Sequence, residues 1–494
     1  MPAIQFMYVS NVVSRAKTAY KQELAFYLQV ENLAYDKDIA VHWTDQQGEQ
    51  HQVAAKFQHT LPGELEAWCA KVVVQGHAPE LLPGDIDFIF CYRALQQEFW
   101  AQPESGFFHS SANSGITLAP ELESLNLSFD PQIHRQQRLL PINIAVKHSV
   151  AAKAVIIHWT TNNWRSSVQT VCRTPKVRIT RKPPATQLWS ANLDIEQVFH
   201  LQYCICIETE DGNIWDNYSG HNFVAQRKPL SIMILNLHCY QEDNQDAKFS
   251  QIAKAIDDYD VDIICFQEVA ELWNDGHGDW DSNSANIINH RLRKAYHLFT
   301  DWSHLGFNKY REGVALLSRY PFSQVDARYV SNSHDPFDIH SRKVVRAEIE
   351  YPAIGRLNIF SAHLSWWEDG FFEQYQNLSL WAAESRTEEC KATLLCGDFN
   401  IAAGSRGYQH VVQANEYEDQ FLAANASGLF DRIFRVNDPH WQQSLEQDHR
   451  IDYIFMHKSS ELKVVSADVI FTEHDYGRVS DHCGYIMHFE PKYA

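Results

Sequence analysis

Short apolar runs in the second half of the chain end on polar side chains, and this pattern constrains the fold more than any other feature. Apolar runs such as 230–237 and 261–266 bracket helical spacing at Phe249, Ile252 and Ile256. Strand–helix–strand order of this kind predicts a layered α/β domain with polar residues at the strand ends. The polar side chains concerned are Asn236, Glu268, His363, Asp398, Asn400, Asp452, Asp481 and His482.

The types of these side chains indicate metal and phosphate chemistry. Mg²⁺ prefers oxygen ligands and usually takes one or two carboxylates together with substrate phosphate and water. Asn236 and Glu268 suit such a site. The two histidines, each at the end of an apolar run and near a carboxylate, suit proton transfer or phosphate binding. We therefore expect a divalent metal here, Mg²⁺ or alternatively Mn²⁺.

The first half of the chain carries an internal repeat with a different pattern. The run 41–44 (Val-His-Trp-Thr) recurs at 157–160 (Ile-His-Trp-Thr), an offset of 116 residues. A cysteine followed nine residues later by a tryptophan also recurs, at 91–100 and 206–215. Alternating runs rich in β-branched and aromatic residues lie between these landmarks and predict antiparallel strands. Each unit spans roughly 100 residues, the size of one β-sandwich.

The length agrees with this division, since 494 residues correspond to about three domains. The fold class we expect is multidomain, with two all-β sandwich modules followed by an α/β domain. We place the two sandwich modules at 1–125 and 140–226. The α/β domain then occupies 230–494, after a junction at 224–229.

The charge is unevenly distributed and argues against polyanionic partners. The formal net charge is −20; residues 1–230 carry 19 basic and 22 acidic side chains, and residues 231–494 carry 23 and 40. Nucleic acids and anionic membranes are attracted by positive fields, which neither half supplies. We therefore expect no nucleic-acid partner and no membrane partner, and an anionic ligand that is held locally with the help of a cation. The oligomeric state stays open.

The sequence shows neither the pattern of a secretory signal nor that of a membrane span. The first twenty residues contain no apolar core of the 7–15 residues that a secretory signal needs. No stretch approaches the 18 apolar residues of a membrane span. Ten cysteines are scattered without a C-x-x-C pair, which predicts free thiols in a reducing compartment. We expect a cytoplasmic protein.

The ordered motifs resemble those of the endonuclease/exonuclease/phosphatase superfamily, which includes deoxyribonuclease I, abasic-site endonucleases, sphingomyelinases and inositol phosphatases. The resemblance covers about residues 230–490. It implies a four-layer, deoxyribonuclease I-like α/β sandwich, two face-to-face β-sheets with helices outside and the site at one end. The matching segments are Gln267-Glu268-Val269, Gly313–Pro321, Gly397-Asp398-Phe399-Asn400, Arg450-Ile451-Asp452-Tyr453 and Ser480-Asp481-His482.

The resemblance implies that Asn236 and Glu268 hold the metal and that Asp481 joins the metal or water network. The metal would polarise the phosphoryl oxygen and stabilise the leaving alkoxide. Water would attack phosphorus in line, without a covalent intermediate.

The same resemblance implies roles for the remaining residues. Asp398 and Asn400 would orient the attacking water and a phosphate oxygen. Asp452 would fix the tautomer of His482 through a hydrogen bond, and His363 would bond a phosphate oxygen or assist the leaving group. The identity of the general base stays open between Asp398 and His482.

The second unit of the repeat resembles the starch-binding modules of carbohydrate-binding family 21. The resemblance rests on the runs 160–164 and 211–223, in which indole faces can stack on glucose and amides can bond its hydroxyls. It implies α-glucan binding by Trp164, Trp215 and Asn217. The first unit has no Asn-rich turn at the equivalent place, so we interpret it as a degenerate module. The alternative is that both units are spacers or dimerisation surfaces.

The substrate we expect is a small phosphorylated sugar. Trp366 and Trp367 belong to the aromatic run 365–375, which directly follows the strand of His363 and would lie near the mouth of the site. Together with Arg311 they are the candidate substrate-binding residues, although core packing is an alternative role for the aromatic run. The whole arrangement resembles that of the maltose 6'-phosphate phosphatases. A phosphodiesterase of the sphingomyelinase or nuclease type, or a non-catalytic glycan-binding protein, is the alternative.

Overall fold

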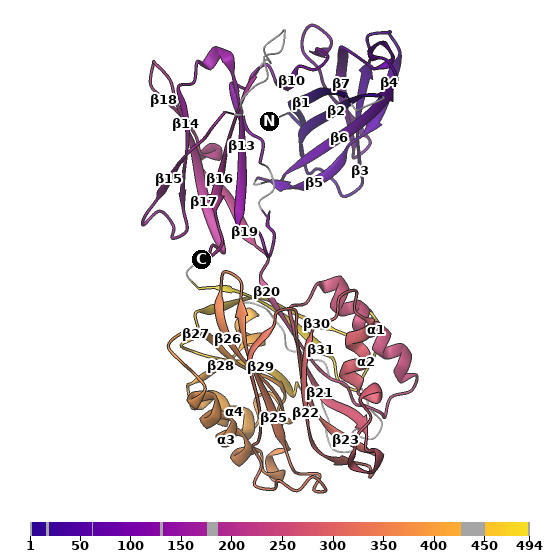
Figure 1. Ribbon diagram of the computed structural model, residues 1–494, viewed down its shortest axis with the longest axis vertical. Helices are drawn as coiled ribbons and strands as arrows, with labels where there is room; N and C mark the ends of the chain where they lie inside the picture. The colour runs from indigo at the N-terminus through magenta and orange to yellow at the C-terminus, as the bar shows by residue number, and fades with distance from the viewer. Residues whose placement is uncertain are drawn as a thin grey trace. The chain divides into compact units, whose positions relative to one another are not determined.

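The computed structural model describes residues 2–15, 19–61, 63–128, 132–174, 186–425 and 450–492. The chain forms two compact units, Met1–Arg227 and Lys228–Ala494 (Figure 1). All ten cysteines are free thiols, as expected. Within the described part of the chain, no helix combines the length and the apolar character needed to cross a membrane.

Two β-sheets enclose one apolar core in the first part of the N-terminal unit. Alternate residues of the second strand are buried, which directs Leu24, Phe26 and Leu28 into the core. One sheet consists, in order, of β10 (Gly115–Leu118), β1 (Ile4–Arg15), β2 (Tyr20–Glu31), β6 (Leu65–Gly76) and β5 (Lys56–Leu61). The other consists of β4 (Gln50–Ala54), β3 (Lys37–Thr44), β7 (Ile86–Ala94) and β8 (Gln97–Ala101), with β9 (Phe108–Ser110) paired to β7.

The second part of this unit repeats the same plan around its own core, which includes Ile144, Ile157 and Ile205. One sheet consists of β11 (Ser124–Asn126), β13 (Leu139–Lys147) and β16 (Thr186–Asp194). The other consists, in order, of β12 (Gln132–Ile133), β19 (Phe223–Arg227), β17 (His200–Glu208), β14 (Ala154–Thr160) and β15 (Val168–Val171), with β18 (Asn213–Asp216) paired to β17.

The internal repeat of the sequence is a repeat of strand pairing. β3 pairs with β7 in the first part, and β14 pairs with β17 in the second part, both antiparallel. In each part the cysteine of the repeat faces its tryptophan on the following strand, Cys91 opposite Trp100 and Cys206 opposite Trp215. The nine-residue spacing therefore records a short β-hairpin that is present twice.

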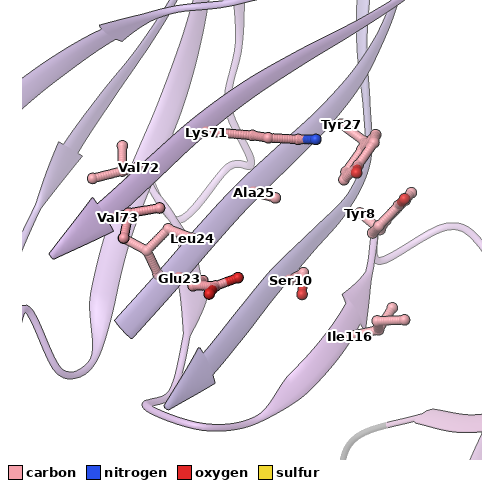
Figure 2. A pocket seen from close by; sticks show the side chains of 10 residues that line it. All are labelled: Tyr8, Ser10, Glu23, Leu24, Ala25, Tyr27, Lys71, Val72, Val73 and Ile116. Carbon is pink, nitrogen blue, oxygen red and sulfur yellow. The ribbon is translucent and has the colours of Figure 1, made fainter. Parts of the chain in front are cut away.

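A cavity of about 310 Å³ lies against β1, β2 and β6, on the sheet face opposite the first core (Figure 2). Tyr8 and Tyr27 stack at this cavity with ring centroids 4.2 Å apart. Lys71 and Glu23 are the charged residues of its lining. Because this lining contains one carboxylate and no histidine, it lacks the side chains that the sequence indicates for catalysis.

Two six-stranded sheets form the centre of the C-terminal unit. The pair β20–β21 and the pair β26–β27 are parallel. The first sheet consists, in order, of β22 (His297–Gly306), β23 (Tyr310–Ser318), β21 (Ile263–Leu272), β20 (Leu230–Asn236), β31 (Gly484–Pro491) and β30 (Leu462–Ile470). The second consists of β24 (Phe322–Tyr329), β25 (Lys343–Tyr351), β26 (Gly355–His363), β27 (Cys390–Asp398), β29 (Asp452–His457) and β28 (Tyr417–Asp419).

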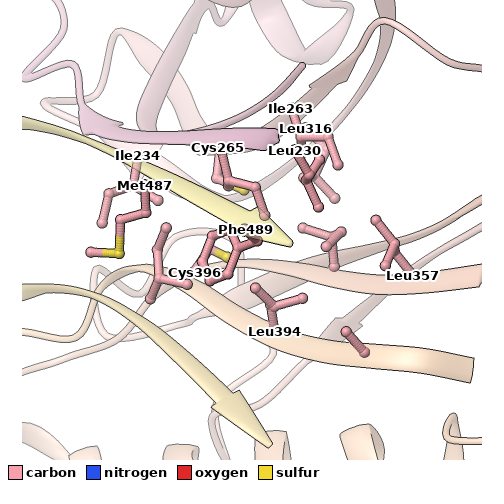
Figure 3. Close-up of a cluster of buried hydrophobic side chains, with 14 of the residues drawn as sticks. Leu230, Ile234, Ile263, Cys265, Leu316, Leu357, Leu394, Cys396, Met487 and Phe489 are labelled. Carbon is pink, nitrogen blue, oxygen red and sulfur yellow. The ribbon is translucent and has the colours of Figure 1, made fainter. Parts of the chain in front are cut away.

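Apolar side chains from both sheets fill the space between them. Ile234, Cys265 and Phe489 of the first sheet share one buried cluster with Leu394 and Cys396 of the second (Figure 3). The strands at the centre are buried on both faces, which explains why they are continuous apolar runs in the sequence.

Helices cover the two outer faces (Figure 1). α1 (Gln245–Tyr259) buries Phe249, Ile252 and Ile256, the helical face expected from the sequence, and shares a core with β20, β21 and α2 (Ser284–Arg291). α3 (Phe371–Glu384) and α4 (Arg406–Gln413) pack on the second sheet. The result is the four-layer, deoxyribonuclease I-like sandwich that the motifs imply. The remaining helical segments are α5 (Gln420–Ala424), η1 (Pro79–Leu81), η2 (His148–Val150), η3 (Tyr218–Gly220), η4 (Asn274–Gly276), η5 (Trp280–Ser282) and η6 (Trp367–Asp369).

Candidate active site

Strand ends from both sheets carry most of the residues that the sequence indicates; Glu268 instead lies within β21 (Ile263–Leu272), so the expectation that it ends a strand is wrong. Asn236 is the last residue of β20, His363 is the last of β26, and Asp398 is the last of β27. In the second sheet, Asp398 is the pairing partner of both His363 and Asp452, the first residue of β29. His482 lies just before β31 in the first sheet. Residues far apart in the sequence thus meet at one end of the sandwich.

A bulge in β21 directs Glu268 toward this end. The register of β21 against β23 shifts between Phe266 and Val269, and Glu268 has a φ of 51°. The preceding residue, Gln267, is buried, and its Nε2 donates to Ser361 Oγ at 3.2 Å. A β-bulge changes the direction of the side chains that follow it, and here it brings Glu268 next to Asn236.

One amide group joins the two central carboxylates. Asn236 Nδ2 donates to Glu268 Oε1 at 2.9 Å and to Asp398 Oδ2 at 3.0 Å. Asn236 Oδ1 accepts the backbone N–H of His238 at 3.0 Å. The amide therefore fixes the separation of two acidic groups that would otherwise repel each other.

The Gly397-Asp398-Phe399-Asn400 run has a backbone reason for its glycine. Gly397 has a φ of 132°, and a Cβ at this position would lie 2.1 Å from the carbonyl oxygen of Ala362. A side chain is excluded both by conformation and by this close approach. Three residues after this glycine, the Asn400 N–H donates to Asp398 Oδ1 at 2.8 Å, which orients the carboxylate.

Both histidines are directed at the same carboxylate oxygen. The Nε2 atoms of His482 and His363 lie 3.7 Å and 3.8 Å from Asp398 Oδ2. The expected hydrogen bond between Asp452 and His482 is present, with Asp452 Oδ2 2.8 Å from His482 Nδ1. Asn400 Nδ2 lies 3.2 Å from His363 Nε2. Each histidine therefore has a partner that holds its ring.

Burial and mutual repulsion raise the pKa of the central acids. Burial, followed by the charges of Glu312 and Asp481, raises the pKa of Glu268 to about 8. Burial and the neighbouring Asp452 raise the pKa of Asp398 to about 7. The site therefore concentrates negative charge that the side chains around it do not fully neutralise.

The two histidines are shifted in opposite directions. Burial by itself would lower the pKa of His482, but the charge and hydrogen bond of Asp452, together with the charges of Asp481 and Asp398, outweigh burial and raise that pKa well above the usual value. Burial, together with the positive charge of Arg342 and then His304, lowers the pKa of His363 well below its usual value. Two imidazoles with pKa values pushed apart can donate and accept protons at the same pH.

The donor atoms fit a hard divalent cation. Within the described residues, His238, Glu242 and Asp481 hold donor atoms within 4.8 Å of one another, and so do Asp398, Asp452 and His482. The buried Asp452 Oδ1 has no hydrogen-bond partner in this part of the chain. Crowded carboxylate oxygens are the ligands that Mg²⁺ and Mn²⁺ prefer.

Arg450, the first residue of the Arg-Ile-Asp-Tyr motif, has a structural role. Its buried guanidinium forms an ion pair with Asp419, with Nη1 3.0 Å from Oδ1, and lies 4.4 Å from the ring centre of Tyr453. The Arg450 carbonyl also accepts the N–H of Ala403 at 3.1 Å. These contacts anchor the start of β29, and with it Asp452.

Five residues of this region escape sequence reasoning. His238 Nδ1 lies 2.7 Å from Glu242 Oε1 and 3.6 Å from Asp481 Oδ1. Glu312 lies 3.5 Å from the buried His304. His238 lies two residues after Asn236 in the sequence, and Glu312 directly precedes the Gly313 motif, so closeness to these motifs could have indicated both residues. The remaining three, Glu242, His304 and Arg342, belong to no recognisable motif.

The candidate substrate-binding residues lie in different surroundings. Trp366 and Trp367 are half-buried after the strand of His363, and Arg406 lies over the Trp367 ring at 4.9 Å. Arg311, on β23, forms an ion pair with Glu271 in which Nη2 lies 2.5 Å from Oε1.

The candidate glycan-binding residues of the N-terminal unit lie near one sheet. Trp215 is 52% exposed, and its ring lies 4.9 Å from that of His158. Trp164 is 37% exposed, and its Nε1 donates to Gln202 Oε1 at 2.9 Å. Gln202 on β17 points to the same face as Cys206, the pairing partner of Trp215, because residues four apart in a strand share a face. The Asn217 side chain accepts the Gly220 N–H at 3.0 Å.

Comparison with known proteins identifies relatives of the C-terminal unit. The sequence model of the endonuclease/exonuclease/phosphatase family matches residues 233–482. A protein of that family from Leptotrichia buccalis has a solved structure that is 28% identical, with 53% of this chain and 99% of that chain covered and a TM-score of 0.46. None of the curated proteins compared with the chain matches it.

Solved structures of lower identity carry different descriptions. A mannosyl-6-phosphatase from Bacteroides thetaiotaomicron is 15% identical, covering 53% of this chain and 99% of that one, with a TM-score of 0.41. The TDP2 protein of D. rerio, solved with a single-stranded DNA product, is 17% identical, covering 53% and 98%, with a TM-score of 0.40.

Proposed function

Because this chain belongs to the endonuclease/exonuclease/phosphatase family, whose members are generally metal-dependent hydrolases, we propose that it is a phosphatase acting on a phosphorylated sugar. The observation that carries the proposal is the cluster around Asp398 Oδ2, within 3.7 Å and 3.8 Å of two histidines whose pKa values are shifted apart. Such a cluster supports proton transfer to and from a phosphoryl group.

The metal in this proposal is Mg²⁺, with Mn²⁺ as the alternative, and it would be held by Glu268, Asn236 and Asp481. When bound, it would polarise the phosphoryl oxygen and offset the charge of the acids. The raised pKa of Glu268 supports this assignment, since burial and the charges of Glu312 and Asp481 disfavour its ionised form unless a cation is near.

The protein's own residues would carry the remaining work. Asp452 holds His482 with Nε2 toward Asp398, and the cationic His482 stabilises the carboxylate that orients the attacking water. His363 has a low pKa, so it accepts the hydrogen bond of Asn400 or binds a protonated phosphate oxygen. Water attacks phosphorus directly, and no side chain becomes phosphorylated.

The substrate proposed is maltose 6'-phosphate. Residues 231–494 carry 23 basic and 40 acidic side chains, so their net charge is negative. A negative charge disfavours nucleic acid as a partner. Trp366 and Trp367, after the His363 strand, would stack on the second glucose ring. Ring burial and a few hydrogen bonds of about 1 kcal/mol each would supply about 2–4 kcal/mol of discrimination.

The second part of the N-terminal unit is proposed to bind α-glucan. The exposed indoles of Trp164 and Trp215 support this proposal. Trp164 donates a hydrogen bond to Gln202, Trp215 pairs with Cys206, and Gln202 and Cys206 share one face of β17. Indole faces stack on sugar rings. Ten free cysteines support a reducing compartment, and we propose the cytoplasm.

A substrate panel with the full chain and Mg²⁺ tests the proposal. It contains maltose 6'-phosphate, glucose 6-phosphate, trehalose 6-phosphate, sphingomyelin and abasic DNA, with phosphate release and product analysis as readouts. We expect maltose 6'-phosphate to exceed glucose 6-phosphate by roughly 30- to 1,000-fold in kcat/KM, from the discrimination above at tenfold per 1.4 kcal/mol.

Three outcomes would change the proposal. Equal rates on the sugar phosphates would remove disaccharide specificity. Cleavage confined to sphingomyelin or DNA would replace the phosphatase by a phosphodiesterase. Full activity after exhaustive EDTA treatment would show that the reaction needs no metal, and the metal would then be dropped from the proposed mechanism.

A further inference from the structure

Arg342 is a partly buried cation near the candidate active site that no sequence motif marks. It lies directly before β25, where its N–H donates to Ser331 Oγ at 2.8 Å and its carbonyl accepts the Val330 N–H at 2.9 Å. These two backbone contacts hold the start of the strand. The direction of the side chain is therefore set by the fold and not by a flexible loop.

The guanidinium group of Arg342 is only partly satisfied. Its Nη1 donates to the carbonyl oxygen of Ile339 at 3.0 Å and lies 3.4 Å from His304 Nδ1. The buried Nε has no hydrogen-bond partner among the described residues, and no carboxylate there lies within ion-pair distance of the group. A partly buried charge without an ionic partner is less favourable than one whose opposite charge a ligand supplies.

The charge of Arg342 acts on the catalytic groups. After burial, it is the strongest influence that lowers the pKa of His363. Burial lowers the pKa of Arg342 itself, and the charges of Glu312, Glu268 and Asp398 oppose that change. The guanidinium therefore lies in the same electrostatic field as the two central acids, although it is paired with neither.

We propose that Arg342 binds the terminal oxygens of the substrate's phosphoryl group and selects a dianionic phosphomonoester over a phosphodiester. This inference rests on the proposed phosphatase function. The planar guanidinium can offer two parallel N–H donors to two phosphate oxygens, which a lysine cannot do. A monoester has three terminal oxygens and up to two negative charges, so one oxygen pair remains for Arg342 when the metal takes the third.

A purely electrostatic role is the competing explanation. In that case Arg342 only offsets the acids around it, and its loss would affect every substrate alike. Contact with the phosphoryl group predicts a loss that depends on the substrate. It also predicts weaker binding of inorganic phosphate, the common product of all monoesters.

The experiment compares Arg342→Gln and Arg342→Lys with the wild type in the full chain with Mg²⁺. The matched control is Lys343→Gln, which removes a positive charge one residue away, where Lys343 Nζ pairs with Asp301 Oδ2 at 3.1 Å. The substrates are p-nitrophenyl phosphate and bis(p-nitrophenyl) phosphate, a monoester and a diester with the same leaving group. Inorganic phosphate binding is measured by calorimetry, and folding by thermal melting.

For Arg342→Gln we expect kcat/KM to fall about 100- to 1,000-fold on the monoester and less than tenfold on the diester. Inorganic phosphate should bind at least about tenfold more weakly, and Lys343→Gln should change neither quantity. Arg342→Lys keeps the positive charge, so it should fold and yet lose most of the monoester preference.

Equal losses on the two esters, or unchanged phosphate binding in both Arg342 variants, would overturn the assignment. If the wild type hydrolyses no monoester, the proposed function fails. The comparison of inorganic phosphate binding then tests by itself whether Arg342 contacts the phosphoryl group, because binding requires no turnover.

Discussion

Glu268→Gln distinguishes the effect of the Glu268 charge on the stability of the folded protein from its effect on metal-dependent activity. The substitution keeps the volume of the side chain and removes its charge. We expect the variant to lose metal-dependent activity. In the metal-free protein we expect the variant to be more stable than the wild type at alkaline pH, because an ionised carboxylate no longer has to be buried beside Glu312 and Asp481.

The magnitude follows from the pKa of Glu268, which burial and the neighbouring acids raise from 4.5 to about 8. The folded protein holds this proton more tightly than the unfolded chain does. The free energy of unfolding is therefore greatest below pH 4.5 and falls as the pH rises to about 8. At about 1.36 kcal/mol per pKa unit, an isolated group would lose about 4–5 kcal/mol. Because neighbouring acids titrate with it, we expect roughly 2–3 kcal/mol.

The assay is urea unfolding of the full chain in EDTA at pH 5 and pH 8.5. The wild type should lose roughly 2–3 kcal/mol more than Glu268→Gln between these two conditions. Glu384→Gln is the matched control, because Glu384 is exposed and pairs with Arg328 outside the site. Mg²⁺ should stabilise the wild type at pH 8.5 more than it stabilises the Glu268→Gln variant. The same pH dependence in wild type and variant would refute the argument that Glu268 is buried with a raised pKa.

Three further predictions concern the catalytic pair, a glycine and the N-terminal unit. His482→Ala and Asp398→Ala should each lower turnover about 10²–10⁴-fold with little change in circular dichroism, and a loss below tenfold for either would mean that the catalytic pair is misassigned. Gly397→Ala should destabilise the protein by at least about 1–3 kcal/mol, measured by urea unfolding, because its φ of 132° and the Ala362 carbonyl oxygen exclude a Cβ. Trp215→Ala should abolish the heat of maltoheptaose binding to the full chain without lowering its melting temperature; unchanged binding would favour the spacer interpretation, since Trp215 is 52% exposed.

Local patterns of the sequence were sufficient for the architecture of the C-terminal unit. The helical face at Phe249, Ile252 and Ile256 and the continuous apolar strands predict helices outside two buried sheets, which the structure has. Side-chain periodicity depends on neighbours within a few residues, so it can be read without knowing the fold. The repeat of cysteine and tryptophan nine residues apart is local in the same way, since one hairpin contains both members.

The environment of the site depended on contacts that local patterns do not record. The ordered motifs indicated Asp452 as the partner of His482, and the structure places Asp452 Oδ2 2.8 Å from His482 Nδ1. Arg342 and His304 belong to no motif, and only the packing of β25 against its neighbours brings them into the field of His363.

The family, the layers and the identities of the central acids and histidines could be predicted from the chain's residues alone, because runs of adjacent residues carry these features. Which donor faces which acceptor, and how each pKa is shifted, depended on the folded arrangement. Asn236 bridges Glu268 and Asp398 only because the ends of β20 and β27 meet the bulge of β21. Burial and the charge of residues distant in the chain act through space, and their effect falls with a distance that only the folded structure defines.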